Sequence, residues 1–349
     1  MDIALELCDT YIFDHVYAVL LPASPAPFNL KSGVSNATFW DASSSPWQYE
    51  PASQYISFEP REAAYLSQWT RDNIIRQLIS LYFITWIAGA SIYFIVSSLS
   101  YIFVFDKTTF KHPKFLKNQI RMEIRQAVSA MPWIAVMTVP FFFAEIQGYS
   151  KLYDSTADAP SSWYNYLQFP LFLIFTDFCI YCIHRGLHHP LVYKSLHKAH
   201  HKWIMPTPYA SVAFHPVDGF LQSVPYHVFP FIFPLQKFAY LGLFFFVQLW
   251  TVFIHDGQYV AHGTILNGAA CHTMHHLYFN FNFGQYTTLW DRLGGSYRKP
   301  NEELFRRESK MAAKQWEEQV KEMEKVVKEV EGEDDRSYGP SDPVSKKDL

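Results

Sequence analysis

Closely spaced histidines constrain this chain more than any other feature of its sequence. Six of its fifteen histidines lie between residues 184 and 201, in HRGLHHPLVYKSLHKAHH, and three more lie in HTMHH at 272–276. On a helix, residues three or four positions apart share a face. The spacing therefore predicts helices that direct several imidazoles at one centre, as a HExxH zinc helix does. The three sets are His184 and His188; His197, His200 and His201; and His272, His275 and His276.

These eight histidines are more than one metal ion can use. A structural zinc takes four ligands, and a catalytic zinc takes three and keeps an open position. We therefore expect two ions. Imidazole suits Zn, Cu, Fe and Ni, so the histidines leave the element open. One alternative is a histidine-rich metal transporter or sensor. A transporter is expected to hold its ligands near the bilayer midplane, whereas these sets follow the ends of apolar segments.

Long apolar segments indicate a membrane protein. No charged residue occurs from Leu81 to Phe105, a length that spans a hydrocarbon core of about 30 Å. Two further apolar segments follow at 127–144 and 164–183, and the second carries a single charge at Asp177. We expect an all-α, multi-pass protein with about four transmembrane helices and a cytosolic, histidine-rich metal-binding cap. The net charge of −3 gives no reason to expect nucleic-acid binding.

The last apolar region, at 220–254, is too broken for one straight helix. We predict a hairpin that enters the membrane and returns to the same face, because prolines interrupt a helix. This path brings His255 and the third set back to the face where the first two sets lie. The interrupting prolines are Pro225, Pro230 and Pro234.

Basic residues between the first two apolar segments predict the orientation. Cytosolic loops carry an excess of Lys and Arg, so the segment 107–125 is expected in the cytosol. The loop 148–163 and residues 1–74 are then lumenal, where Asn36 of an N-A-T sequon could be glycosylated. All three histidine sets then meet on the cytosolic side. The basic residues are Lys107, Lys111, Lys114, Lys117, Arg121 and Arg125.

The composition changes after residue 300. Residues 301–331 alternate acidic and basic positions and predict a soluble, partly amphipathic helix. Residues 332–349 have the composition of a disordered tail. Lys346 and Lys347 resemble a dilysine retrieval signal of the endoplasmic reticulum, although a merely solvated tail is the alternative. We therefore expect three regions: an N-terminal region (1–74), a membrane-embedded domain (75–300) and a cytosolic helix with its tail (301–349).

The boxes HRGLH, HKAHH and HTMHH resemble those of the fatty-acid hydroxylase/sterol desaturase superfamily of membrane di-iron enzymes. The text around them is most similar to fungal Δ7-sterol C5(6)-desaturases, over roughly residues 75–300. The similar strings are AFHPVDGFLQSVPYH at 213–227, IHDGQY at 254–259 and NGAACHTMHHLYFNFNFGQYTTLWDRLGGSYRKP at 267–300. This resemblance implies O₂-dependent introduction of the C5–C6 double bond into a Δ7 sterol, in ergosterol biosynthesis.

The resemblance also implies the cofactors and the ligands. It implies two Fe ions, O₂ as co-substrate, and electrons from NADH through cytochrome b5 reductase and cytochrome b5. It places the ligands on the eight box histidines and adds His255 as a ninth. Zinc is redox-inert and could not serve this chemistry. A hydroxylase or methyl oxidase that acts on another sterol or an acyl chain is the alternative, because both reactions begin with the same hydrogen abstraction. The sequence leaves the exact sterol and the oligomeric state open.

Several further residues are candidates for supporting roles. Carboxylates orient metal-bound histidines in many sites, and the nearby ones are Asp177, Asp218, Asp256 and Asp291. His215 and His227 could contact the metals or orient their ligands, whereas His189 points to a different face from His188. Packing or surface roles are expected for His15, His112 and His262, and a structural role for Trp290, Asp291 and Arg292.

The aromatic run at 278–283 could line a flat slot for the sterol. We expect Phe281 to contribute to this slot and to influence sterol selectivity.

Overall fold

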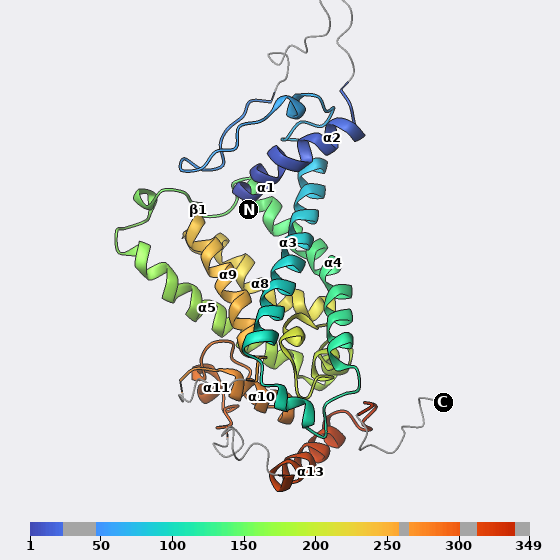
Figure 1. The fold of residues 1–349 in the computed structure, drawn as a ribbon. Coiled ribbons are helices and arrows are strands. Elements are labelled where there is room, and N and C mark those ends of the chain that lie inside the picture. Colours follow the sequence, from blue (N-terminus) through green and yellow to red (C-terminus); the bar gives the residue numbers. More distant parts are fainter. Residues whose placement is uncertain (24–46, 258–264, 301–312, 339–349) are drawn as a thin grey trace, which may run out of the picture.

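The computed structural model describes residues 1–23, 47–257, 265–300 and 313–338 (Figure 1). The described chain is mostly helical, as expected. Its named strands are β1 (Leu152–Tyr153) and β2 (Leu235–Gln236), which form one short parallel pair. The predicted sequon at Asn36, His262 and the two terminal lysines lie outside the described residues.

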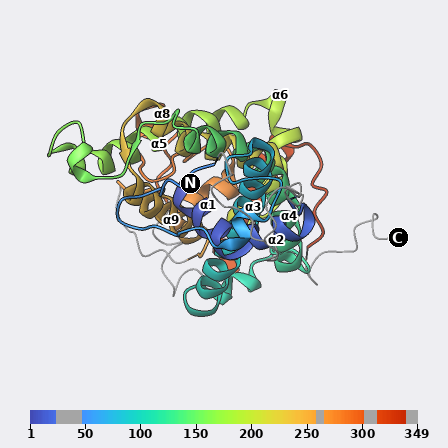
Figure 2. The ribbon, with the colours of Figure 1, turned by 90° about the horizontal axis from the view of Figure 1, so that it is seen from above.

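Three long helices form the frame of the molecule. They are α3 (Ile74–Phe103), α4 (Gln119–Ile146) and α5 (Tyr164–Leu187), and each is long and apolar enough to cross a membrane. They coincide with the first three predicted spans. The side chain of Asn73 caps α3 by accepting hydrogen bonds from two free backbone N–H groups of its first turn. Figure 2 shows α5 and α8 on one side of the bundle and α3 and α4 on the other.

The predicted hairpin is present as α8 (Pro216–Ile232) and α9 (Lys237–Phe253). Each helix has 17 residues, fewer than the roughly 20 of a usual transmembrane helix. The turn between them contains β2, which pairs with β1 just after the end of α4. The hairpin therefore reaches the end of the bundle that lies away from the histidines, and α9 returns the chain to His255.

The N-terminal helices lie across that same end (Figure 1). They are α1 (Asp2–Cys8) and α2 (Asp14–Leu20), joined by the π-helical turn Asp9–Phe13. Two buried arginines fix them to the start of α3: Arg76 lies 2.9 Å from Asp9 and 2.6 Å from Asp14, and Arg71 lies 2.6 Å from Asp14. The N-terminal helices therefore pack on the start of α3 through a buried charge cluster.

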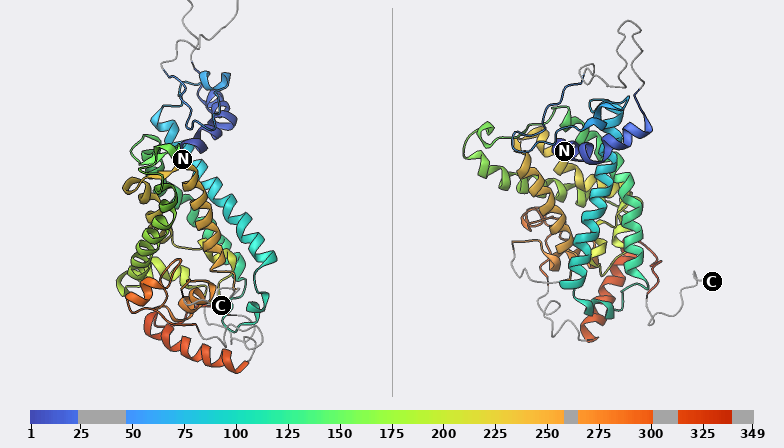
Figure 3. Two further views of the ribbon diagram at one scale, coloured as in Figure 1. Left: turned by 90° about the vertical axis from the view of Figure 1, so that its left-hand side faces the viewer. Right: turned by 45° about the horizontal axis from the view of Figure 1, so that its top comes forward.

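Short helices build the opposite end, where the histidines lie. The helix α13 (Ala313–Val330) crosses beneath it (Figure 3). Met323 and Val327 of α13 are fully buried against Met274 and Leu277 of α10 (Ala269–Tyr278). The other short helices at this end are η4 (Lys107–Lys111), α6 (Pro190–Val192), η6 (Tyr193–His197), α7 (Lys198–His201), η7 (Pro208–Val212) and α11 (Leu289–Leu293). Two more short helices lie elsewhere: η3 (Glu62–Tyr65) contacts α2, and η5 (Thr156–Asp158) follows β1.

The chain stays packed beyond α13. Residues 332–338 fall within the predicted disordered tail, yet Arg336 is only 5% exposed and Tyr338 only 8%. Tyr338 also forms a β-bridge with Leu116, next to the start of α4. The composition of this segment is polar, but its long side chains find buried partners. We refer to residues 313–338 as the C-terminal strap.

Candidate metal centre

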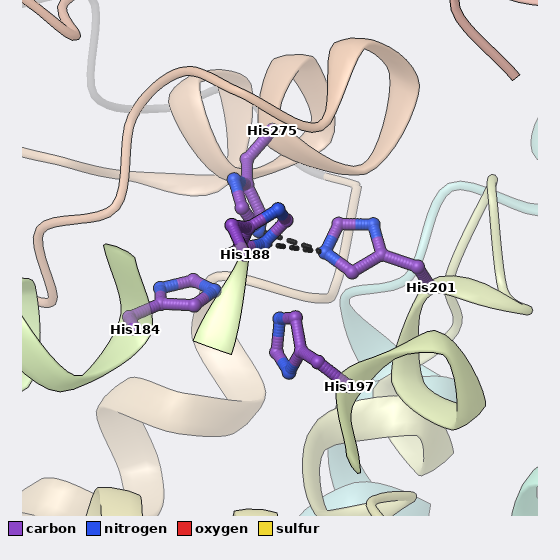
Figure 4. A group of neighbouring side chains, drawn as sticks. All are labelled: His184, His188, His197, His201 and His275. Carbon is purple, nitrogen blue, oxygen red and sulfur yellow. Dashed lines mark hydrogen bonds between the residues drawn. The ribbon is translucent and has the colours of Figure 1, made fainter. Parts of the chain in front are cut away.

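The nine predicted ligands form two groups of buried side chains. Within each group, one ring nitrogen per residue lies within 4.8 Å of all the others. Every one of these histidines is at most 9% exposed. The first group, drawn in Figure 4, is His184, His188, His197, His201 and His275; the second is His200, His255, His272 and His276.

The division cuts across two of the three sequence sets. Adjacent helical residues point about 100° apart, because the helix has 3.6 residues per turn. His201 belongs to the first group, whereas its neighbour His200 belongs to the second. The pair His275–His276 divides in the same way, with His275 in the first group. The second and third sets therefore each contribute to both groups, whereas His184 and His188 both lie in the first group.

The ring nitrogens converge as ligands of a cation would. In the first group, the Nε2 atom of His201 lies 3.1 Å from that of His188 and 3.0 Å from that of His275 (Figure 4). Imidazole nitrogens bound 2.0–2.1 Å from one ion at roughly right angles would be about 3 Å apart. The Nε2 atoms of His184 and His197 are buried without a hydrogen-bond partner among the described residues. These unpaired nitrogens fit a bound metal ion.

The second group has the same arrangement. The Nε2 atom of His272 lies 3.0 Å from that of His255 and 3.1 Å from that of His276. The Nδ1 atom of His255 donates to the carbonyl oxygen of Thr251 at 2.7 Å. A carbonyl oxygen can only accept, so the proton is on Nδ1 and the Nε2 lone pair is free for a metal.

A carboxylate orients one ligand of the first group. Nδ1 of His197 donates to Oδ2 of Asp218 at 2.7 Å, and both side chains are fully buried. Asp218, one of the four carboxylates that the sequence proposed, therefore contacts a candidate ligand ring directly. Its second oxygen, Oδ1, accepts a hydrogen bond from Nε2 of Gln222 at 2.7 Å.

Backbone carbonyls of the loop 281–287 orient two more ligands. Nδ1 of His184 donates to the carbonyl of Phe283 at 3.0 Å, and Nδ1 of His275 donates to that of Phe281 at 2.7 Å. Carbonyl contacts of this kind depend on how the loop folds, so no pattern of side chains in the sequence predicts them.

Two of the predicted carboxylates hold that loop in place. Asp291 accepts from the backbone N–H groups of Phe283 at 2.9 Å and Gly284 at 2.8 Å. Asp177 accepts from the N–H groups of Gln285 at 2.9 Å and Tyr286 at 2.7 Å. Both carboxylates therefore act on the metal ligands through the loop and not on the rings themselves.

Burial keeps the histidines in the form that binds metals. It lowers the pKa of His275 to about 3 and that of His255 to about 4. Burial, together with the neighbouring imidazoles, also lowers the pKa of His200 and His201. Neutral imidazole is the metal-binding form, so these rings are ready to bind at neutral pH.

A cavity of about 160 Å³ lies beside both groups. The histidines that line it are His184 of the first group and His200, His255 and His272 of the second. Its apolar wall comes from α4, α5, α8 and α9, through Ile134, Ile180, Tyr226, Phe244 and Val247 among others. An apolar chamber next to two sets of metal-binding nitrogens suits a lipid substrate.

Comparison with known proteins agrees with this description. Residues 169–296 match the model of the fatty acid hydroxylase family. The Delta(7)-sterol 5(6)-desaturase erg3A of Aspergillus fumigatus is 63% identical, with 100% of both chains aligned. The probable Delta(7)-sterol 5(6)-desaturase of Neurospora crassa is 60% identical over 99% of this chain and 100% of its own. The chain belongs to the Delta(7)-sterol 5(6)-desaturase family.

A more distant relative has the same name. The Delta(7)-sterol 5(6)-desaturase ERG3 of Saccharomyces cerevisiae is 47% identical over 99% of this chain and 100% of its own. No solved structure gives a significant match. The fatty acid hydroxylase match includes both histidine groups and Asp218, whereas the C-terminal strap lies beyond it.

Three further histidines lie outside both groups. His189 and His215 each cap a helix, because their Nδ1 atoms accept from the backbone N–H groups two residues later. His227 is buried on α8 and packs between the rings of Phe141 and Phe244. These histidines therefore have structural environments rather than positions among the converging nitrogens.

The aromatic run at 278–283 has a different role from the predicted one. Phe281 is not among the residues that line the cavity; its ring lies 5.5 Å from the guanidinium of Arg298. Phe279 stacks on His201 at 4.9 Å, and the ring of Phe283 lies 5.5 Å from that of His275. The run packs the histidines in place, while the cavity wall comes chiefly from the bundle helices.

The C-terminal strap also contacts the first group, which the sequence did not suggest. Nη2 of Arg336 donates to the carbonyl oxygen of His201 at 3.0 Å. The same guanidinium pairs with Glu331 at 2.8 Å, and Glu331 accepts from the hydroxyl of Tyr193 at 2.8 Å. The Tyr193 ring in turn lies 5.5 Å from His188. The polar composition of residues 332–349 predicted a disordered tail and gave no indication of this buried network.

Proposed function

We infer that this protein is a Δ7-sterol 5(6)-desaturase, an oxidoreductase that introduces the C5–C6 double bond into a Δ7 sterol. The observation that carries this function is the pair of buried histidine groups beside an apolar cavity, in a chain that matches desaturases of that name from end to end. Removal of two hydrogens consumes one O₂ and two electrons with two protons, and yields two waters.

We propose that each histidine group holds one iron ion. The bound irons would supply the O₂-dependent removal of hydrogen, which redox-inert zinc could not. The chain's own residues bury all nine imidazoles, and Asp218, Thr251 and the loop 281–287 orient four of them. The ligand set contains no carboxylate, so the positive charge of the ions is balanced only by neighbouring groups.

We propose that the sterol occupies the cavity and presents C5 and C6 to the histidines that line it. Its flat ring system matches the apolar wall of α8 and α9, and the enclosing helices exclude water from the reacting carbons.

We further propose that the protein resides in the endoplasmic reticulum membrane with the histidines and the C-terminus in the cytosol. Electrons would arrive from NADH through cytochrome b5 reductase and cytochrome b5. The basic segment 107–125 and the histidines lie at the same end of the bundle, which supports this orientation (Figure 1).

Cysteine labelling tests the orientation. In sealed microsomes, an impermeant maleimide should label Lys111→Cys directly and Tyr149→Cys only after detergent is added, because these exposed positions lie at opposite ends of the bundle. The reverse pattern would invert the proposed topology.

A microsomal assay tests the reaction. The protein is expressed in cells that lack their own C5-desaturase and is supplied with a Δ7 sterol, NADH and oxygen. We expect a Δ5,7-diene by mass spectrometry and ultraviolet absorbance, and none from His200→Ala or without oxygen. A hydroxylated sterol would assign the protein to the hydroxylase alternative instead.

A further inference from the structure

Gln222 connects the cavity to the first histidine group. It lies on α8, and its side chain lines the cavity. Its Nε2 atom donates to Oδ1 of Asp218 at 2.7 Å, while Oδ2 of the same carboxylate accepts from His197 at 2.7 Å. Two hydrogen bonds therefore separate the cavity wall from a proposed metal ligand.

This hydrogen bond determines which way the Gln222 amide faces. An ionised carboxylate can only accept, so the amide nitrogen must point to Asp218. The carbonyl oxygen, Oε1, is then left on the other side of the amide. Among the described residues, no donor bonds to Oε1. An acceptor that lacks a partner in an apolar chamber costs free energy, which a ligand with a hydroxyl donor would recover.

Ser211 offers the complementary group in the same cavity. Its hydroxyl is fully buried and has no hydrogen-bond partner in the described part of the chain. Two other hydroxyls of the lining donate to helix carbonyls: Ser223 donates to Phe220 at 2.7 Å, and Thr251 donates to Val247 at 2.8 Å. The Tyr226 hydroxyl pairs with that of Tyr286 at 3.4 Å. Gln222 and Ser211 thus place an acceptor and a hydroxyl donor, both without partners among the described residues, on the lining of one cavity, as a single hydroxyl ligand requires.

The proposed substrate carries one such group. A sterol has a single hydroxyl, at C3, and C3 belongs to the same six-membered ring as C5. When C5 and C6 face the histidines that line the cavity, the hydroxyl must therefore stay at that end of the chamber. We propose that Gln222 Oε1 accepts a hydrogen bond from the sterol 3-hydroxyl, that Ser211 donates one to it, and that this pair determines which ring carbons face the metals.

This inference rests on the proposed function and deepens it. The rest of the sterol is apolar, so burial alone would allow the ring system to slide or turn over in the cavity. A hydrogen-bonded 3-hydroxyl allows one register. Because the same Gln222 amide holds Asp218, the substrate hydroxyl and the His197 ring are also joined through one hydrogen-bonded chain.

The test compares a Δ7 sterol with its 3-deoxy counterpart in purified, iron-loaded protein. Dissociation constants are measured by competition against a labelled sterol, and iron content is measured in parallel. The wild type should favour the hydroxylated sterol by about tenfold or more, and Gln222→Met and Ser211→Ala should each lose most of that preference. The matched control is Gln248→Met, which alters a second cavity glutamine on α9 and should keep the preference.

The outcomes separate the possible roles. If Gln222→Met retains both irons and the full hydroxyl preference, the proposal is overturned. If Gln222→Met loses iron, the result for Ser211→Ala decides, because Ser211 bonds to no ligand histidine. A Ser211→Ala variant that keeps its iron but loses the hydroxyl preference supports the proposal. A Ser211→Ala variant that retains the hydroxyl preference overturns it. Wild-type protein that binds and converts the sterol without a hydroxyl preference would refute this inference alone. Wild-type protein that neither binds nor converts a Δ7 sterol would refute the proposed function.

Discussion

Two histidine pairs show how neighbouring residues can belong to different candidate metal sites. His200 and His201 are neighbours in the chain, yet their rings belong to different groups, and His275 and His276 repeat the arrangement. Neighbouring residues of a helix point about 100° apart, so the two rings of each pair are directed to different groups. Ligands beyond the pairs then complete each group.

Removal of one ligand should empty one site and spare the other. His197→Ala should lower the iron content of purified protein toward about one ion per chain, because the affected group loses its carboxylate-oriented ligand. His227→Ala is the matched control, because His227 is equally buried but lies outside both groups, so it should retain both ions. Metal analysis measures the iron content of the two variants. If His197→Ala retains both irons, His197 is not a ligand.

At the scale of elements, the loop 281–287 and the C-terminal strap support the metal centre from two sides. The loop supplies carbonyl acceptors to His184 and His275, and the strap reaches the backbone of His201. Neither element contributes a ligand. Both should therefore affect stability and metal retention together.

A methyl group at Gly284 should distort the loop. A Cβ there would collide with the backbone oxygen of Thr287 and crowd the Asp291 carboxylate at 3.1 Å. Gly284→Ala should lower the free energy of unfolding by about 1–3 kcal/mol and weaken iron retention. Gly89→Ala meets no atom within 4 Å on α3, so its effect should stay within about 1 kcal/mol. Equal thermal stability of the two variants in detergent would contradict this account.

The buried arginine of the strap should matter far more than a partly exposed one. Arg336→Met leaves the buried Glu331 with only the more distant Lys198, at 3.5 Å, and should cost about 3 kcal/mol of stability, with loss of iron from the first group. Arg298→Met removes an ion pair with Glu322 that is only partly buried, and should cost about 1 kcal/mol. Chemical unfolding and iron analysis of both variants measure the difference, and similar losses would show that the strap is dispensable.

At the scale of the whole molecule, buried polar networks close both ends of an apolar bundle. Arg71 and Arg76 hold the N-terminal helices at one end, and the histidines with the strap fill the other. Removal of metal leaves the second end with many neutral, buried imidazoles. Its stability should therefore depend on pH.

Metal-free protein should lose stability as the pH falls below about 6.5. Burial lowers the pKa of His255 to about 4 and of His275 to about 3, so only the unfolded chain binds these protons between the ordinary and the lowered pKa. Each such histidine costs about 1.4 kcal/mol per pH unit in that window and nothing above it. Thermal unfolding at pH 7.5 and 5.5 measures the loss. His255→Gln should reduce it, and His15→Asn, at an exposed position, should not.

Local patterns in the sequence were enough to predict the apolar helices, the hairpin and the capacity for two metals. These properties depend on composition and helical spacing over short stretches, so they can be read from neighbouring residues. The boxes and the surrounding strings also indicated the family, which the full-length relatives then confirmed.

Tertiary structure alone decided how the histidines divide, which atoms orient them and what encloses them. The contacts of Arg336 with His201 and of His184 with Phe283 join residues 135 and 99 positions apart. Such contacts depend on the path of the folded chain and on backbone carbonyls, which every residue has, so spacing cannot reveal them. The sequence determined the chemistry available to this protein, and the packing of distant segments decided where that chemistry is assembled.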